Sequence, residues 1–115
     1  MADIKAAVTD NERQMLEELM AGIRVRFGDL LLDARLFGSK ARGDSGPESD
    51  VDVWLLFRRQ LTLEERDEVY GLVFSLDRAH RTYTQVVLDS LQRWEMPGYR
   101  VSGFAQAVRE EGLPV

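Results

Sequence analysis

Apolar residues between Asp10 and Phe27 recur at three- and four-residue spacing, the period of one face of an α-helix. These positions are Met15, Leu16, Leu19, Met20, Ile23 and Phe27. Thr9 followed three residues later by Glu12 is the pattern of a capping box, and Gly28 stands where a left-handed C-cap is expected. The chain is therefore predicted to form a helix over residues 10–27.

Two short apolar runs follow and predict β-strands. Residues 34–37 end in Gly38-Ser39, which predicts a strand running into a tight turn. Residues 50–57 begin by alternating acidic and apolar positions and then become wholly apolar, as in a central strand. Only turn-forming residues, at 44–49, precede the second run, so the two strands are expected to be neighbours.

The second half of the chain repeats the helix–strand–helix pattern. Thr62 and Glu65 form another capping box ahead of an apolar stripe, which predicts a helix over about 62–79. Residues 82–88 predict a third strand, and residues 99–111 predict a last helix with Gly112 at its C-cap. This order of elements predicts one α+β domain over residues 1–115.

Composition excludes several classes of function. The 115 residues carry 15 Lys and Arg against 20 Asp and Glu, a formal charge of −5, which argues against a nucleic-acid-binding protein. The absence of cysteine excludes disulfides and thiolate metal sites, and a single histidine excludes a multi-histidine site. No apolar run approaches a membrane span or a signal peptide, so we expect a cytoplasmic protein.

One segment carries residues suited to phosphate chemistry. Asp50 and Asp52 lie two apart on a predicted strand, so both carboxylates share one face, about 6–7 Å apart along the chain. Two acids in that arrangement suit Mg²⁺, which takes one or two protein carboxylates together with substrate phosphate oxygens. Gly38 and Ser39 offer close backbone approach and donors for a phosphate, and Arg42 adds a guanidinium. Carboxylates facing a phosphate cradle indicate metal-assisted phosphoryl or nucleotidyl transfer.

Each feature alone has an ordinary structural explanation. Asp-x-Asp is often a solvated strand end, Gly-Ser is usually a turn, and Lys40, Arg42 and Asp44 read as a solvated turn with local ion pairs. The combination is more specific, because Gly-Ser, ten intervening residues and Asp-x-Asp are independent features at a fixed spacing.

The composite Gly38-Ser39-x10-Asp50-x-Asp52, with Ala41-Arg42-Gly43 inside it, resembles the minimal nucleotidyltransferases (MNT) of the DNA polymerase beta superfamily. The resemblance extends to the antitoxin of HEPN–MNT toxin–antitoxin pairs. It implies a nucleotidyltransferase-like mixed β-sheet of about three to four strands flanked by helices.

The resemblance also implies roles for individual residues. Gly38, Ser39 and Arg42 would bind the nucleotide phosphates, and Asp50 and Asp52 would be the catalytic acids that bind Mg²⁺ or Mn²⁺. ATP would be the donor, and AMP would be transferred to a tyrosine of the HEPN toxin. The implied partners are a nucleoside triphosphate and that toxin, and a homo-oligomer is also compatible.

The sequence departs from this family at one position. Active members commonly carry a third carboxylate on the next strand, where this chain has Gln85. Asp89 lies four residues further, about 13 Å along a strand, and is expected to cap the following helix. Gln85, Asp89 and Lys40 are therefore weaker site candidates. Three alternatives stay open: transfer with two carboxylates, a site completed by a partner, or binding without turnover.

Two functions from different classes follow. The first is a Mg²⁺-dependent enzyme that transfers a nucleoside monophosphate to a hydroxyl of a partner protein, with a small-molecule acceptor as a further choice. The second is a non-catalytic antitoxin or adaptor with a decayed site. The intact Asp50 and Asp52 favour the first, and Gln85 favours the second.

Overall fold

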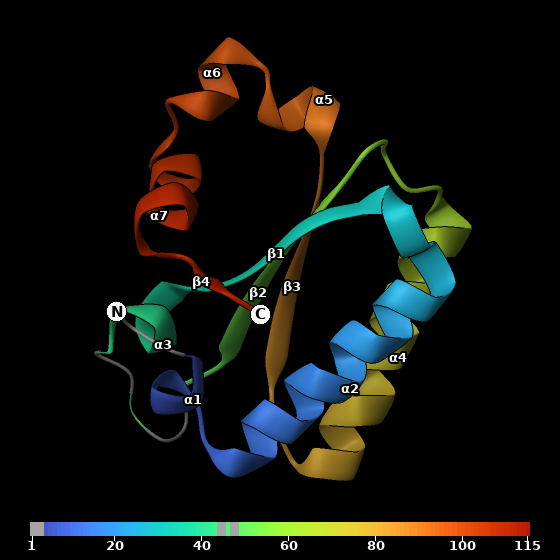
Figure 1. The fold of residues 1–115 in the computed structure, drawn as a ribbon, viewed down its shortest axis with the longest axis vertical. Helices are drawn as coiled ribbons and strands as arrows, with labels where there is room; N and C mark the ends of the chain where they lie inside the picture. The colour runs from blue at the N-terminus through green and yellow to red at the C-terminus, as the bar shows by residue number, and fades with distance from the viewer. Residues whose placement is uncertain (1–3, 44–45, 47–48) are drawn as a thin grey trace.

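The computed structural model describes residues 4–43, 46 and 49–115 and shows a mixed four-stranded sheet with helices on both sides (Figure 1). The strand order is β3-β2-β1-β4, in which β3 is parallel to β2 and the other neighbours are antiparallel. The strands are β1 (Leu31–Phe37), β2 (Val51–Phe57), β3 (Thr84–Ser90) and β4 (Leu113–Pro114). The predicted α+β class, with a mixed sheet flanked by helices, is confirmed.

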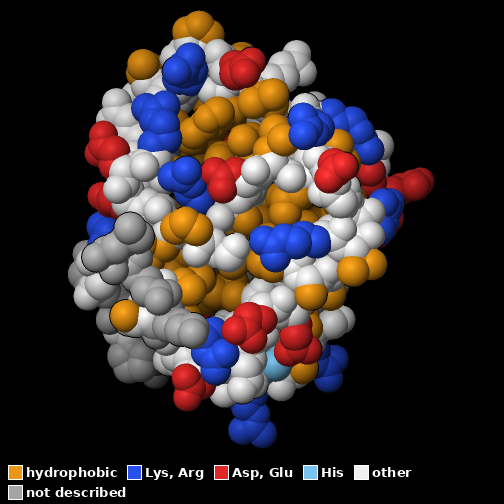
Figure 2. All heavy atoms as spheres, in the orientation of Figure 1, with side chains coloured by type: hydrophobic (Ala, Val, Ile, Leu, Met, Phe, Trp, Pro, Cys, Tyr) orange, Lys and Arg blue, Asp and Glu red, His pale blue; other side chains and the backbone are white. Residues whose placement is uncertain are grey.

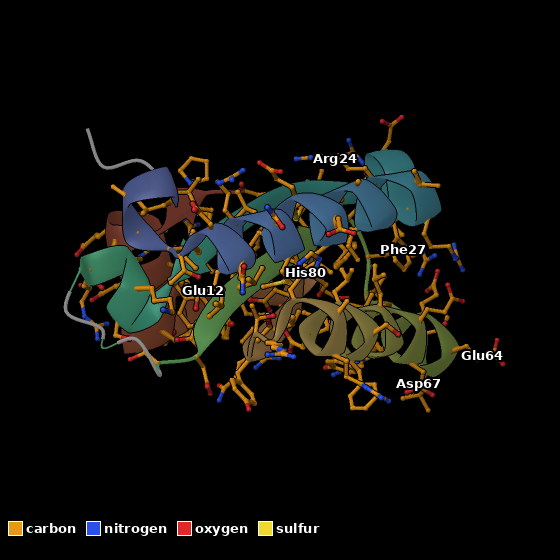
Figure 3. All side chains as sticks on the ribbon, turned by 90° about the horizontal axis from the view of Figure 1, so that it is seen from below. Glu12, Arg24, Phe27, Glu64, Asp67 and His80 are labelled. Carbon is orange, nitrogen blue, oxygen red and sulfur yellow. The ribbon has the colours of Figure 1, made fainter. Side chains whose placement is uncertain are left out.

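The helices fall into two groups. The long helices α2 (Asp10–Phe27) and α4 (Leu63–His80) lie side by side against one face of the sheet (Figure 3). Three short helices follow β3 and pack toward the other face: α5 (Leu91–Trp94), α6 (Pro97–Arg100) and α7 (Gly103–Glu111). The remaining elements are α1 (Ile4–Ala7), η1 (Gly28–Leu30) and α3 (Gly38–Arg42). Among the described residues, no helix is long and apolar enough to cross a membrane.

Both predicted capping boxes are present, and they explain where the long helices begin. In α2 the Thr9 hydroxyl accepts the Glu12 N–H at 3.2 Å, and the Glu12 carboxylate accepts the Thr9 N–H at 2.9 Å. Thr62 and Glu65 do the same for α4. Gly28 ends α2 with a φ of 54° and a ψ of −128°. The positive φ favours glycine at this position, but the ψ lies outside the left-handed helical region that was predicted.

The apolar stretch of β2 is wholly buried because both of its faces are covered. Val53 and its alternate neighbours pack against α2 and α4, whereas Trp54 and Leu56 pack against the side of α7. Figure 2 shows apolar side chains along the middle of one face of the molecule, with charged side chains around them. The apolar cluster on the α7 side holds fewer buried residues than the cluster under α2 and α4, and Phe37, Trp94 and Phe104 are only partly buried.

Several predicted boundaries were wrong: β1 begins at Leu31 rather than at Ala34, and two other differences have identifiable reasons. The third strand begins at Thr84 rather than at Thr82, because Asp77 of α4 accepts the Thr82 hydroxyl and the Thr84 N–H and thereby ties the connection to the helix end. The predicted last helix is divided into α6 and α7, because the Ser102 hydroxyl accepts the Ala105 N–H and starts a new helix.

Asp89 does not cap α5, contrary to the prediction. The Ser90 hydroxyl accepts the Arg93 N–H and performs that role. The Asp89 carboxylate is 3% exposed and accepts the Trp54 indole N–H at 2.9 Å and the Tyr99 hydroxyl at 2.7 Å. Burial and this hydrogen bond raise the pKa of Tyr99. Asp89 thus fastens α6 to the sheet.

Replacing Tyr99 by Phe should lower the free energy of unfolding by about 1–3 kcal/mol, because the buried Asp89 carboxylate loses one of its donors. Urea denaturation measures this change. Tyr70→Phe, at an exposed position of α4, is the matched control and should change stability by less than about 0.5 kcal/mol. Equal effects of the two substitutions would contradict the anchoring role of Asp89.

Candidate functional site

The end of β1 and the beginning of β2 form the candidate site. The predicted tight turn at Gly38-Ser39 is in fact the first turn of the short helix α3, which ends at Gly43 in the left-handed conformation. Phe37 and Asp52 are paired across the two antiparallel strands, so α3 begins beside Asp52. Most of the predicted turn at 44–49 lies outside the described residues.

Gly38 is required by its neighbour as well as by its backbone. Its φ is 76°, a conformation that residues with a side chain rarely adopt. A Cβ at this position would lie inside van der Waals contact with Asp52 Oδ2 and 3.2 Å from Asp52 Cγ. The missing side chain therefore leaves the space that the Asp52 carboxylate occupies at the beginning of α3.

Asp50, Asp52 and Gln85 meet at the adjacent edge of the β2–β3 pair. Gln85 lies opposite Asp52 in the parallel register, the place where the family resemblance implies a third carboxylate. Its amide nitrogen donates to Asp50 Oδ2 at 2.8 Å. Partial burial and the nearby Asp50 charge raise the pKa of Asp52, and Arg42 opposes this shift. Two negative charges are thus held close together in partial isolation from water.

The donor set of this site fits a hard divalent cation that is shared with a substrate. Two carboxylates lie close enough to interact, and Gly38 leaves Asp52 Oδ2 room beside α3. Within the described ranges, no group of three or more Asp, Glu or His side chains is placed to hold a metal. A cation here would therefore draw further ligands from outside this group, as Mg²⁺ does with phosphate oxygens.

Lys40 is a structural residue, not part of a solvated turn as predicted. Its side chain is 3% exposed, and its ammonium lies 3.0 Å from Glu12 Oε2. Glu12 belongs to the capping box of α2, so this ion pair fastens α3 to the beginning of α2, where Figure 3 shows Glu12. Arg42 remains beside the site, 44% exposed, and pairs with Glu111 of α7 at 3.7 Å.

Asp89 is excluded from the site. It lies opposite Leu56, whereas Gln85 lies opposite Asp52, so Asp89 is four residues further along the same strand pair. Its buried contacts with Trp54 and Tyr99 keep it there.

The structure adds a cavity that the sequence patterns did not indicate. It has a volume of about 510 Å³, adjoins Asp50, and lies between the beginning of α2 and the connection from α4 to β3. Arg81 and Tyr83 line it; Arg81 has a φ of 57°, and Tyr83 is 74% exposed. No local sequence signal marks these two residues, because they become site neighbours only when β3 pairs with β2.

Comparison with known proteins gives a consistent result. The family model of the nucleotidyltransferase domain matches residues 17–102. A relative from Methanocaldococcus jannaschii, provisionally named a protein adenylyltransferase, is 39% identical over 56 residues, which are 49% of this chain. The matched segment spans 57% of the length of that relative.

Solved structures share the fold. A minimal nucleotidyltransferase, provisionally so named, superposes with a TM-score of 0.61 at 22% identity, over 99% of this chain and 97% of that one. A chain in the crystal structure of a toxin–antitoxin with AMP-PNP gives a TM-score of 0.53 at 23% identity, over 85% of this chain and 70% of that one.

Replacing Gly38 by Ala should displace the Asp52 carboxylate, whereas Gly43→Ala should not. Both glycines have a positive φ, so each substitution should cost about 1–3 kcal/mol of backbone strain. Only at Gly38 does the added Cβ meet another group, because nothing lies within 4 Å of that position at Gly43. Urea denaturation should show a larger loss for Gly38→Ala, and equal losses would contradict the close approach.

Asp52→Asn should make the protein more stable at pH 7 in the presence of EDTA. A carboxyl whose folded-state pKa is raised favours folding when protonated, and this contribution is lost as the pH rises through that raised pKa. The stability gain should therefore disappear below the ordinary pKa of about 3.8. Urea denaturation of wild type and Asp52→Asn at pH 7 and below pH 3.8 measures this gain. Asp33→Asn removes the ion pair to Arg35 and is the control, which should not stabilise the protein.

Proposed function

The chain belongs to the nucleotidyltransferase domain family, and on that premise we propose that it transfers a nucleoside monophosphate, AMP from ATP, to a hydroxyl of a partner protein. The observation that carries this proposal is the pair Asp50 and Asp52, of which Asp52 lies directly against Gly38 at the beginning of α3. A solvated strand end would not need a left-handed glycine beside its carboxylate.

Each residue then has a defined task. Gly38 and Ser39, at the beginning of α3, bind the phosphates of the nucleotide, and the Arg42 guanidinium offsets their charge. Asp50 and Asp52 hold the cation, Mg²⁺ or Mn²⁺. That cation, when bound, stabilises the negative charge that develops on the phosphate oxygens during displacement.

The proposed reaction is a single displacement at the α-phosphorus of the nucleotide. The acceptor hydroxyl oxygen forms the new bond to phosphorus, and the bond to the oxygen bridging the α- and β-phosphates breaks. Pyrophosphate leaves with that electron pair, and the hydroxyl proton passes to solvent or to a base of the acceptor protein. The acceptor would approach through the cavity beside Asp50, past Tyr83 and Arg81.

We propose an HEPN-type toxin as the acceptor, with this chain as its antitoxin in the cytoplasm. Two similarities support this proposal. The relative that is 39% identical is provisionally named a protein adenylyltransferase, and this chain shares its fold with a chain of a toxin–antitoxin crystal structure.

A second candidate function is nucleotide and partner binding without transfer. The observation in its favour is Gln85, a neutral amide that cannot act as a base, at the position of the third carboxylate. Label transfer from α-labelled ATP separates this candidate from the enzyme, because only the enzyme labels an acceptor.

The double substitution Asp50→Asn with Asp52→Asn should abolish transfer while the protein stays folded, because it removes the charges that hold the cation. The measurement is label transfer from α-labelled ATP with Mg²⁺ to the proposed toxin partner. Asp33→Asn, opposite Leu56 and away from the site, is the control for loss of a carboxylate elsewhere on the sheet and should keep transfer. Transfer by the double variant at the wild-type rate would reject the site, and nucleotide binding without transfer by the wild type would favour the second candidate.

A further inference from the structure

We propose that Gln85 makes this a site that takes a single divalent cation, and takes it together with the nucleotide rather than beforehand. This inference rests on the proposed function, because it concerns the metal and nucleotide of the same site. It concerns a positioning residue, since Gln85 acts through Asp50.

The first argument is the hydrogen bond that Gln85 makes. Its amide nitrogen lies 2.8 Å from Asp50 Oδ2, so a donor already satisfies one of the two Asp50 carboxylate oxygens. Gln85 is exposed and Asp50 is half-buried, so the bond orients a carboxylate that water would otherwise solvate in many directions. A cation that binds Asp50 must compete with this donor or use the other oxygen.

The second argument is charge. Asp50 and Asp52 are two residues apart at the beginning of β2, and Gln85 binds the first and lies opposite the second. A carboxylate at position 85, opposite Asp52, would add a third negative charge and make the empty site costly. The amide adds none, and the positive end of its dipole faces Asp50. The site without metal therefore carries less repulsion than one with a third carboxylate, and its attraction for a free cation is correspondingly smaller.

The third argument is the number of ligands. Mg²⁺ requires six oxygens in near-octahedral geometry, and it is commonly held by one or two carboxylates with substrate phosphates. Two carboxylates meet that requirement for one cation once a triphosphate supplies further charged oxygens. A second cation would need another acid, and the described residues provide no such group of three. The phosphates of the nucleotide thus complete the site.

The test compares Mn²⁺ binding to wild type, Gln85→Asp and Gln85→Ala by electron paramagnetic resonance, first without nucleotide. Gln85→Asp should bind Mn²⁺ at least about tenfold more tightly than wild type, because one added charge near a divalent cation is worth more than that factor. Gln85→Ala removes the hydrogen bond without adding charge and is the matched control; it should stay well below Gln85→Asp. Equal Mn²⁺ affinity of wild type and Gln85→Asp would overturn the proposal.

Thermal denaturation gives a readout independent of catalysis. In EDTA, Gln85→Asp should melt below wild type, and Mn²⁺ alone should restore it, whereas wild type should respond only when AMP-PNP is added with Mn²⁺. A wild-type protein that Mn²⁺ alone stabilises as strongly as Gln85→Asp would contradict the order of binding. If Gln85→Asp does not fold, Gln85→Glu carries the same added charge on the longer side chain.

The stoichiometry with nucleotide completes the test. Equilibrium dialysis with AMP-PNP should retain one Mn²⁺ per chain in wild type and more than one in Gln85→Asp. Two Mn²⁺ per chain in wild type would reject the single-cation site but leave the proposed transfer intact. No retained AMP-PNP in any variant would instead reject the proposed function, and the comparison without nucleotide would still decide the role of Gln85.

Discussion

The pairing of β1 with β2 is the constraint on which the rest of the site depends. Because Phe37 lies opposite Asp52, the chain that leaves β1 enters α3 directly beside a carboxylate. Only a residue without a side chain fits there, and Gly38 also supplies the positive φ that turns the strand into the helix. A shift of one residue in this register would send Asp52 to the opposite face of the sheet.

Two buried polar contacts hold the elements around that pairing. The Lys40–Glu12 ion pair joins α3 to α2, and Asp89 joins α6 to the sheet through Trp54 and Tyr99. Buried charges cost desolvation energy, so such pairs fix position more effectively than they add stability. They lie at opposite ends of the strands, and the pair at the site end keeps α3 in place beside Asp52. The exposed hydrogen bond from Gln85 to Asp50 likewise fixes the position of a side chain, at the surface of the site.

The predictions that succeeded came from short-range patterns. The helix over 10–27 and both capping boxes depend on residues three or four apart, and β2 is recognisable because its apolar run is buried on both faces. The predictions that failed depend on partners distant in the chain. Thr82 is tied to Asp77 instead of pairing in β3, and Lys40 is buried where it pairs with Glu12 at the beginning of α2. Local propensity cannot indicate either contact.

The sequence by itself determined the order of the elements, the spacing of Gly38-Ser39 and Asp50-x-Asp52, and the amide at position 85, because covalent order and side-chain chemistry need no folding to be known. The tertiary structure decided which of these groups meet. The Gln85–Asp50 and Asp89–Trp54 contacts each join residues 35 positions apart, and the first places Gln85 at the site while the second removes Asp89 from it. The physical reason is that sheet register, set by the burial of whole faces, aligns side chains that no local interaction brings together.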